Sequence, residues 1–284
     1  MLAWPETVPA VPLFPSEERA NVTTTDLRHH RTNDVDFAYR RAGTGDPLVF
    51  LHGLGMTRRW LPIHAALAER FDMIAPEHPG FGDTPRPQRL CGHDAIVAAE
   101  CALLHDLDVP RFHLVGHSAG ALLAAMLTVA EPERVRSLTL ITPSPLPVAT
   151  PAEFMPTPPP PGTDFDQLLF NGNAASYPAF LNGGDNGNNY EAAAAGEERV
   201  DPPFDMFDAP ALHTQLNRIT CPRQVLIPDE DRIFDLRCFD VWAHALGDVP
   251  IVRITGTDLP TGHLLIVQEP EAITTAVAAL AATA

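Results

Sequence analysis

Residues 112–130 read FHLVGHSAGALLAAMLTVA, and this stretch decides the fold. The apolar run 112–115 is typical of a buried strand, and the apolar run 121–127 continues with helical spacing. Between them stands Ser118, with a glycine two positions away on either side. Glycines at these positions permit the close backbone approach that a sharp turn from strand to helix requires. The stretch therefore predicts a strand, a tight turn and a helix, with the Ser118 hydroxyl exposed above the end of a sheet.

The same alternation of strand and helix continues along most of the chain. Runs typical of strands recur at 35–40, 48–51, 71–75, 138–141, 224–227 and 251–254. Segments with helical spacing lie at about 60–70, 93–107, 119–130, 239–246 and 270–282. Strands that alternate with helices predict the α/β class, with a mostly parallel central sheet covered by helices on both faces.

Two segments interrupt this alternation. The Pro-rich residues 1–25 show neither strand nor helix periodicity and are expected to form an N-terminal arm. Residues 143–211 are rich in Pro, Gly, Asn and acidic residues, and a loop of that length within a domain is typical of a functional lid or of disordered chain. We therefore expect a core made of 26–142 and 212–284, with a lid or cap insertion at 143–211.

The composition indicates one globular domain. Of the 284 residues, 45% are hydrophobic and 19% charged, and no run reaches the ~18 apolar residues of a membrane span. The formal net charge of −17 argues against a nucleic-acid partner, because phosphate binding needs clustered Lys and Arg. The first residues lack the basic region of a secretory signal peptide, so a cytoplasmic location without stable membrane insertion is expected. The four cysteines are too scattered for a disulfide scaffold or a zinc site.

Ser118 is the candidate nucleophile. A serine between a strand and a helix N-terminus has an accessible hydroxyl, and the helix favours negative charge that develops nearby. The alternative is a serine that only caps the helix. Upstream, His52-Gly53-Leu54-Gly55 follows the strand at 48–51. A turn of this kind can direct a backbone N–H at a developing oxyanion, so the Leu54 and Ala119 amides are the expected donors.

The order of these motifs resembles that of the α/β-hydrolase superfamily. The resemblance rests on His52-Gly53, on APEHPGFGDT at 75–84, on GHSAG at 116–120, on an acid after a late strand and on a final Gly-His. It extends from about Val35 to the C-terminus and leaves the arm and the lid unmatched. It implies an α/β-hydrolase fold and catalytic residues in the order serine, acid, histidine.

The resemblance implies a catalytic acid just after the strand that follows the lid, in the pattern G-x-x-D-x-I. Residues 228–233 read PDEDRI, which aligns Asp231 with that acid but places proline where glycine is usual. Asp229 and Glu230 remain close rivals, because such a triad is defined by geometry. Some relatives carry the acid after the preceding core strand, but 142–144 reads TPS and has no carboxylate.

His263 is the candidate general base among 12 histidines. It follows Gly262 in the loop after the strand 251–254, and its place in chain order after Asp231 matches the resemblance. From such a loop an imidazole can take the serine proton and return it to the leaving group, while a carboxylate holds the correct tautomer.

Substrate-pocket candidates are residues of the oxyanion turn, of the elbow and of the lid: His52, Gly53, Met56, Trp60, His117, Phe154, Phe170 and Phe180. The alternative is that the aromatic residues only anchor the lid to the core. The lid is strongly acidic, which disfavours an anionic substrate. No His-Glu-x-x-His run, clustered cysteines or phosphate-binding glycine loop occurs, so neither a metal nor a cofactor is expected.

These features predict a serine hydrolase that cleaves an ester, lactone or thioester of a neutral or cationic hydrophobic small molecule through an acyl-enzyme. The same fold hosts other chemistry, so an acyltransferase, a lyase, a cyclase or a C–C bond hydrolase of a natural-product pathway is the alternative. A binding protein that has lost catalysis is a third class. The only partner expected is the small-molecule substrate, and the sequence does not specify an oligomeric state.

Overall fold

The computed structural model describes residues 25–86, 90, 92–157, 159–160, 162–181, 209 and 211–284. The predicted N-terminal arm lies outside these residues except for Thr25. So does the stretch 182–208 of the predicted lid.

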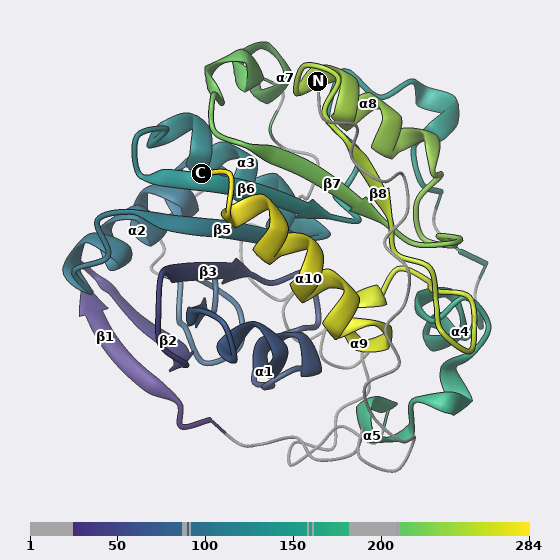
Figure 1. The fold of residues 1–284 in the computed structure, drawn as a ribbon, viewed down its shortest axis with the longest axis horizontal. Helices are drawn as coiled ribbons and strands as arrows, with labels where there is room; N and C mark the ends of the chain where they lie inside the picture. The colour runs from purple at the N-terminus through teal and green to yellow at the C-terminus, as the bar shows by residue number, and fades with distance from the viewer. Residues whose placement is uncertain are drawn as a thin grey trace.

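An eight-stranded sheet forms the centre of the protein (Figure 1). Its spatial order is β1-β2-β4-β3-β5-β6-β7-β8, and all neighbours from β4 to β8 are parallel, whereas β1–β2 and β2–β4 are antiparallel. This confirms the predicted fold class. The strands are β1 Arg28–Thr32, β2 Val35–Ala42, β3 Pro47–Leu51, β4 Asp72–Pro76, β5 Phe112–His117, β6 Val135–Ile141, β7 Arg223–Ile227 and β8 Ile251–Arg253.

Helices cover both faces of the sheet (Figure 1). One face packs against α1 Pro62–Ala68, α9 Leu265–Gln268 and α10 Pro270–Ala281. The other packs against α2 Gly92–Asp106, α3 Ala119–Ala130 and α8 Arg237–Ala245. Side chains along a strand alternate between these two cores, as strand geometry requires. In β3, Leu48 and Phe50 face the first core, and Val49 and Leu51 face the second.

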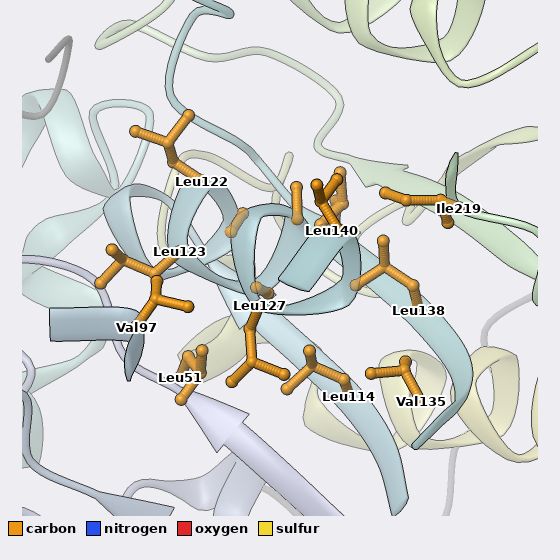
Figure 2. Close-up of a cluster of buried hydrophobic side chains, with 14 of the residues drawn as sticks. Leu51, Val97, Leu114, Leu122, Leu123, Leu127, Val135, Leu138, Leu140 and Ile219 are labelled. Atoms are coloured by element: carbon orange, nitrogen blue, oxygen red, sulfur yellow. The ribbon is translucent and has the colours of Figure 1, made fainter. Parts of the chain in front are cut away.

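Helix α3 is apolar on all sides because it is buried between the sheet and other helices. Figure 2 shows Leu127 next to Leu114 of the sheet and Leu123 on the side of Val97 of α2, all within one buried cluster. The approach of α3 to β3 is close enough to require glycine, since a Cβ at Gly120 would lie 2.3 Å from the Leu51 carbonyl oxygen. The glycine spacing of the sequence motif therefore has a direct steric cause.

Short helical pieces follow β6 in the described part of the predicted lid. They are η2 Ala152–Phe154, α4 Phe165–Leu169, η3 Ala174–Ser176 and α5 Pro178–Leu181; α7 Leu212–Gln215 and η5 Leu216–Arg218 precede β7. The α4 end is tied to the core, because the Leu264 amide donates to the Leu169 carbonyl over 3.0 Å. Within the described residues, no helix has the length and apolar character needed to cross a membrane.

Candidate active site

Ser118 forms the turn between β5 and α3. Its backbone angles, φ 53° and ψ −121°, are unusual for a residue with a side chain. Such a conformation costs roughly 1–3 kcal/mol and persists only where the surroundings impose it. Here the Ser118 N–H donates to the Ile141 carbonyl over 2.9 Å, and the Ser118 carbonyl accepts from the Ala121 and Ser144 amides at 3.0 and 3.2 Å. The strained turn is thus held through both of its backbone polar groups.

His263 reaches Ser118 from the loop between β8 and α9. Its Nε2 lies 3.0 Å from the Ser118 Oγ, and its Nδ1 lies 2.8 Å from the Asp231 Oδ2. The histidine and aspartate side chains are 4% and 0% exposed. A carboxylate can only accept from Nδ1–H, so Nε2 is left without a proton and can accept one from the serine hydroxyl.

Asp231 is itself held in place by two backbone amides. Its Oδ1 accepts from the N–H groups of Ile233 and Phe234 at 2.8 and 2.9 Å. One carboxylate oxygen therefore faces the imidazole, while the other is fixed by the turn that follows β7. This arrangement sets both the position and the acceptor role of the carboxylate.

The two rival carboxylates lie elsewhere. Asp229 Oδ2 accepts from the Gly256 and Thr261 amides, each at 3.0 Å. Glu230 is exposed and donates its amide to the Thr261 carbonyl over 3.2 Å. Asp229 thus braces the loop that carries His263, whereas Asp231 is the carboxylate that contacts the imidazole.

Two further side chains brace the His263 loop, and sequence reasoning did not single them out. The Thr261 hydroxyl donates to the Ile254 carbonyl over 2.7 Å, and the Gln268 Oε1 accepts from the Gly262 amide over 2.7 Å. His117 Nε2 also lies 3.1 Å from the His263 carbonyl oxygen. Apart from their closeness to the Gly-His pair, nothing in the sequence distinguishes Thr261 and Gln268 from other polar residues.

The expected oxyanion turn lies directly against the Ser118 turn. A Cβ at Gly53 would lie 3.0 Å from the Ser118 Cβ and 2.8 Å from the His117 Nδ1. For the expected donors, the Leu54 and Ala119 amides, no hydrogen-bond acceptor is found among the residues that the structure describes. A backbone N–H group that lies near a nucleophilic serine and has no acceptor of its own is suited to receive a developing negative charge.

The two histidines beside this turn are buried and uncharged. Burial, together with the neighbouring His263, lowers the pKa of His117 to about 3. Burial is also the main reason that the pKa of His52 lies well below its usual value, with a smaller contribution from His78. Both imidazoles are therefore neutral near pH 7, where they act as one donor and one acceptor each.

The aromatic and methionine pocket candidates lie in the core or in the segment between β6 and β7. Met56, Trp60, Phe170 and Phe180 belong to the core between the sheet and α1, α9 and α10. Phe180 also lies 4.7 Å from the Arg59 guanidinium, and Phe154 lies 4.0 Å from that of Arg237. These contacts tie the described residues between β6 and β7 to the core, and among the candidates Gly53 packs against both Ser118 and His117.

Polar groups that could bind a metal do not cluster in the described ranges. Within them, no group of three or more His, Cys, Asp or Glu side chains is arranged to hold an ion. The polar chemistry of the candidate site is therefore that of a serine, an imidazole, a carboxylate and backbone amides.

The chain is similar to one family model and to several known proteins. The model of the alpha/beta hydrolase family matches residues 48–276. The chain is 35% identical over 113 residues (39% of this chain) to a pimeloyl-(acyl-carrier protein) methyl ester esterase of Aeromonas hydrophila. It is 35% identical over 104 residues (35% of this chain) to a 2-hydroxy-6-oxo-2,4-heptadienoate hydrolase of Pseudomonas putida. These matches span 43% and 38% of the two relatives, so less than half of either length is covered.

Among solved structures, the fold is similar to that of an esterase from Rhodococcus sp. ECU1013. The TM-score is 0.68 at 20% identity, over 90% of this chain and 98% of that one. At this identity the likeness concerns the fold. Together with the family match, the relatives support a hydrolase.

Proposed function

The chain belongs to the alpha/beta hydrolase family, and from that premise we propose that it is a serine hydrolase of carboxylic esters, lactones or thioesters. The observation that carries the proposal is the hydrogen-bonded series from Asp231 through His263 to Ser118, which ends on a strained turn. A buried imidazole that accepts from a serine and donates to a carboxylate is the arrangement that activates a serine hydroxyl.

The reaction follows from these contacts. His263 Nε2 takes the proton of Ser118 Oγ as that oxygen bonds to the substrate carbonyl carbon. The oxyanion that forms is stabilised by the Leu54 and Ala119 amides. The tetrahedral intermediate collapses to the acyl-enzyme, and the leaving alcohol or thiol takes the proton from His263. Water then attacks the acyl-enzyme by the same route, which yields the acid and regenerates Ser118.

For the substrate we propose a neutral or cationic hydrophobic small molecule. The net charge of −17 repels anionic ligands that come within the screening length of the salt solution. His52 and His117, which lie beside the proposed nucleophile, add no positive charge near pH 7, because both are neutral. An anionic acyl group would therefore find little compensation beside Ser118.

The experiment is labelling with a fluorophosphonate probe and intact-mass readout, followed by turnover of p-nitrophenyl esters of increasing acyl length. Ser118→Ala should abolish labelling and lower kcat by about 10⁶-fold, since the nucleophile of a catalytic triad acts as part of a unit. Ser176→Ala is the matched control, because Ser176 is exposed and lies in η3.

Three outcomes would contradict the proposal. Ester turnover that survives Ser118→Ala would assign the chemistry to another group. Turnover of 2-hydroxy-6-oxo-2,4-heptadienoate without turnover of any ester would favour the activity named for the Pseudomonas putida relative. Rapid acyl transfer to an added alcohol with no free acid would favour the acyltransferase alternative.

A further inference from the structure

A buried histidine–glutamate pair lies beside the 52–58 turn, outside the proposed proton-transfer series. His78 follows β4, and its Nδ1 contacts the Glu100 Oε1 of α2. The two side chains are 3% and 1% exposed. The other edge of the same imidazole faces the turn, where His78 Nε2 lies 3.0 Å from the His52 carbonyl oxygen. The rings of His52 and His78 are 3.9 Å apart between centroids.

The partners determine where the protons lie. A carbonyl oxygen only accepts, so His78 Nε2 carries a proton. The backbone N–H of His78 only donates, and it lies 3.1 Å from His52 Nε2. His52 Nε2 is therefore the acceptor, which leaves the ring proton of this neutral histidine on Nδ1. That Nδ1 lies 2.9 Å from the Gly53 carbonyl oxygen and donates to it.

The Gly53 carbonyl belongs to the same peptide unit as the Leu54 N–H. Because a trans peptide is planar, its N–H points away from its carbonyl, and fixing one fixes the direction of the other. The Gly53 oxygen is held by His52 Nδ1 and also by the Met56 amide at 3.3 Å. The direction of the Leu54 N–H is thus set by a series that runs from Glu100 through His78 and His52 to Gly53.

The far end of the turn is held by the residue next to His78. Glu77 Oε1 accepts from the Arg58 amide over 2.7 Å, and its Oε2 accepts from the Asp83 amide over 2.5 Å. Consecutive residues after β4 therefore hold both ends of the 52–58 turn. The difference between them is that Glu77 accepts from a backbone amide of the turn, whereas His78 donates to the His52 carbonyl and packs against the His52 ring.

We propose that His78 and Glu100 are positioning residues, which orient the Leu54 amide toward the oxyanion through His52. This inference rests on the proposed function, because it assigns a role only if Leu54 is an oxyanion donor. A buried histidine–carboxyl contact by itself is weak evidence for stability, since apolar residues of similar volume are often equally stable in the place of buried polar pairs. A positioning role and a structural role therefore differ in what they predict for an apolar replacement of both residues.

The test measures kcat, KM and Tm of the double variant His78→Leu/Glu100→Leu with a p-nitrophenyl ester. We expect a folded protein whose kcat falls by about 10²-fold while KM changes little, because one oxyanion donor contributes about that factor. Glu100→Gln is the conservative variant. The amide of the introduced glutamine can donate to His78 Nδ1, so the ring proton stays on His78 Nε2 and still donates to the His52 carbonyl. Most of kcat should therefore be retained.

A second variant covers the case in which the double variant does not fold. His52→Phe keeps a ring against His78 but removes the donor to the Gly53 carbonyl. It should lower kcat by a similar factor. In the triple variant His52→Phe/His78→Leu/Glu100→Leu, the loss in kcat should be smaller than the product of the two separate losses, because both changes act on one peptide unit.

Wild-type kcat in the folded double variant, or in His52→Phe, would overturn the inference. Fluorophosphonate labelling separates this failure from that of the proposed function. If the wild type is labelled at Ser118 and the variants are labelled equally fast, the positioning role alone is wrong. If the wild type is neither labelled nor active on esters, the proposed function is wrong and the inference falls with it.

Discussion

Two loops meet at Ser118, and they present different kinds of group to it. The loop between β8 and α9 presents a side chain, the imidazole of His263. The turn at 52–58 presents backbone, and its proposed functional group is the Leu54 N–H. Both are braced by polar residues, but the bracing differs. Asp229 holds the His263 loop by accepting from two amides, whereas the start of the 52–58 turn is held by two imidazoles in contact, tilted by 34° to each other.

The difference follows from what each loop must control. An imidazole keeps its own freedom to rotate, so bracing of its loop must be supplemented by a partner on the ring, which Asp231 supplies. A backbone amide has no side chain to adjust, so its direction depends on the peptide plane alone. The side chains that matter for the turn are therefore those that contact carbonyl oxygens, and residue 54 could be any type except proline, which has no N–H.

Among changes to the residues that hold the two loops, the largest effect is expected at Asp231, whose carboxylate contacts the His263 ring. Asp231→Asn can present an amide N–H₂ to His263 Nδ1, which would force the proton onto Nε2 and remove its ability to accept from Ser118. We expect kcat/KM to fall by about 10⁴-fold, as for loss of the orienting carboxylate in other triads. The measurement is steady-state ester hydrolysis, with circular dichroism to verify folding.

Asp229→Asn is the matched variant two residues away. Its remaining carbonyl oxygen can still accept from the loop amides, so kcat/KM should fall by less than about tenfold, which corresponds to ~1.4 kcal/mol. A larger loss at Asp229 than at Asp231 would reverse the assignment of the two carboxylates and remove the distinction between ring partner and loop brace.

Much of the fold could be predicted because its signals are local. The parallel strands are continuous apolar runs, and the glycines around Ser118 stand where α3 approaches the Leu51 carbonyl. The pairing of Ser118, Asp231 and His263 was predictable from chain order, and the structure brings the three within hydrogen-bonding distance. Their catalytic role stays a prediction for the experiments above. Helix α9 was not predicted, since it is only four residues long and immediately precedes α10.

The braces could not be predicted in the same way, because they depend on contacts between distant segments. Glu100 is 22 residues from His78 in sequence, and no local pattern joins them. One signal was present: Glu100 lies on the apolar side of α2, among Ile96, Val97, Leu103 and Leu104, all of which are buried. A carboxylate at such a position needs a buried partner, although the sequence does not say which.

A smaller effect on kcat is expected from a substitution in the 52–58 turn. Gly53→Ala would place a Cβ 3.0 Å from the Ser118 Cβ and 2.8 Å from the His117 Nδ1, so the turn must move away from the serine. A displacement of about 1 Å at a catalytic group costs about 10²-fold in kcat. Gly162→Ala is the control for strain without a clash, since a Cβ there meets nothing within 4 Å and the strain from its φ of +82° is confined to an exposed turn. Equal kcat values for the two variants would show that the position of the 52–58 turn does not matter for turnover.

The smallest effect concerns His117, which touches both loops. Its pKa in the folded protein, about 3, lies below the usual 6.5, chiefly because of burial. As the pH falls below 6.5, the unfolded chain takes up a proton that the folded protein does not, so the stability contributed by the neutral imidazole is present above pH 6.5 and is lost progressively down to about pH 3. His117→Gln removes this titration and keeps an N–H that can reach the His263 carbonyl.

Denaturant unfolding at pH 7, 6 and 5 should therefore show that the wild type loses about 1 kcal/mol more than His117→Gln between pH 6 and pH 5. His64 and His113, whose pKa values burial lowers to about 3 and 4, are present in both proteins and cancel in the difference. His105→Gln, at an exposed position, serves as the control. Parallel stability curves for His117→Gln and the wild type would mean that His117 is accessible to protons in the folded protein. The contact between the His263 loop and the Ser118 turn would then be looser than the 3.1 Å hydrogen bond implies.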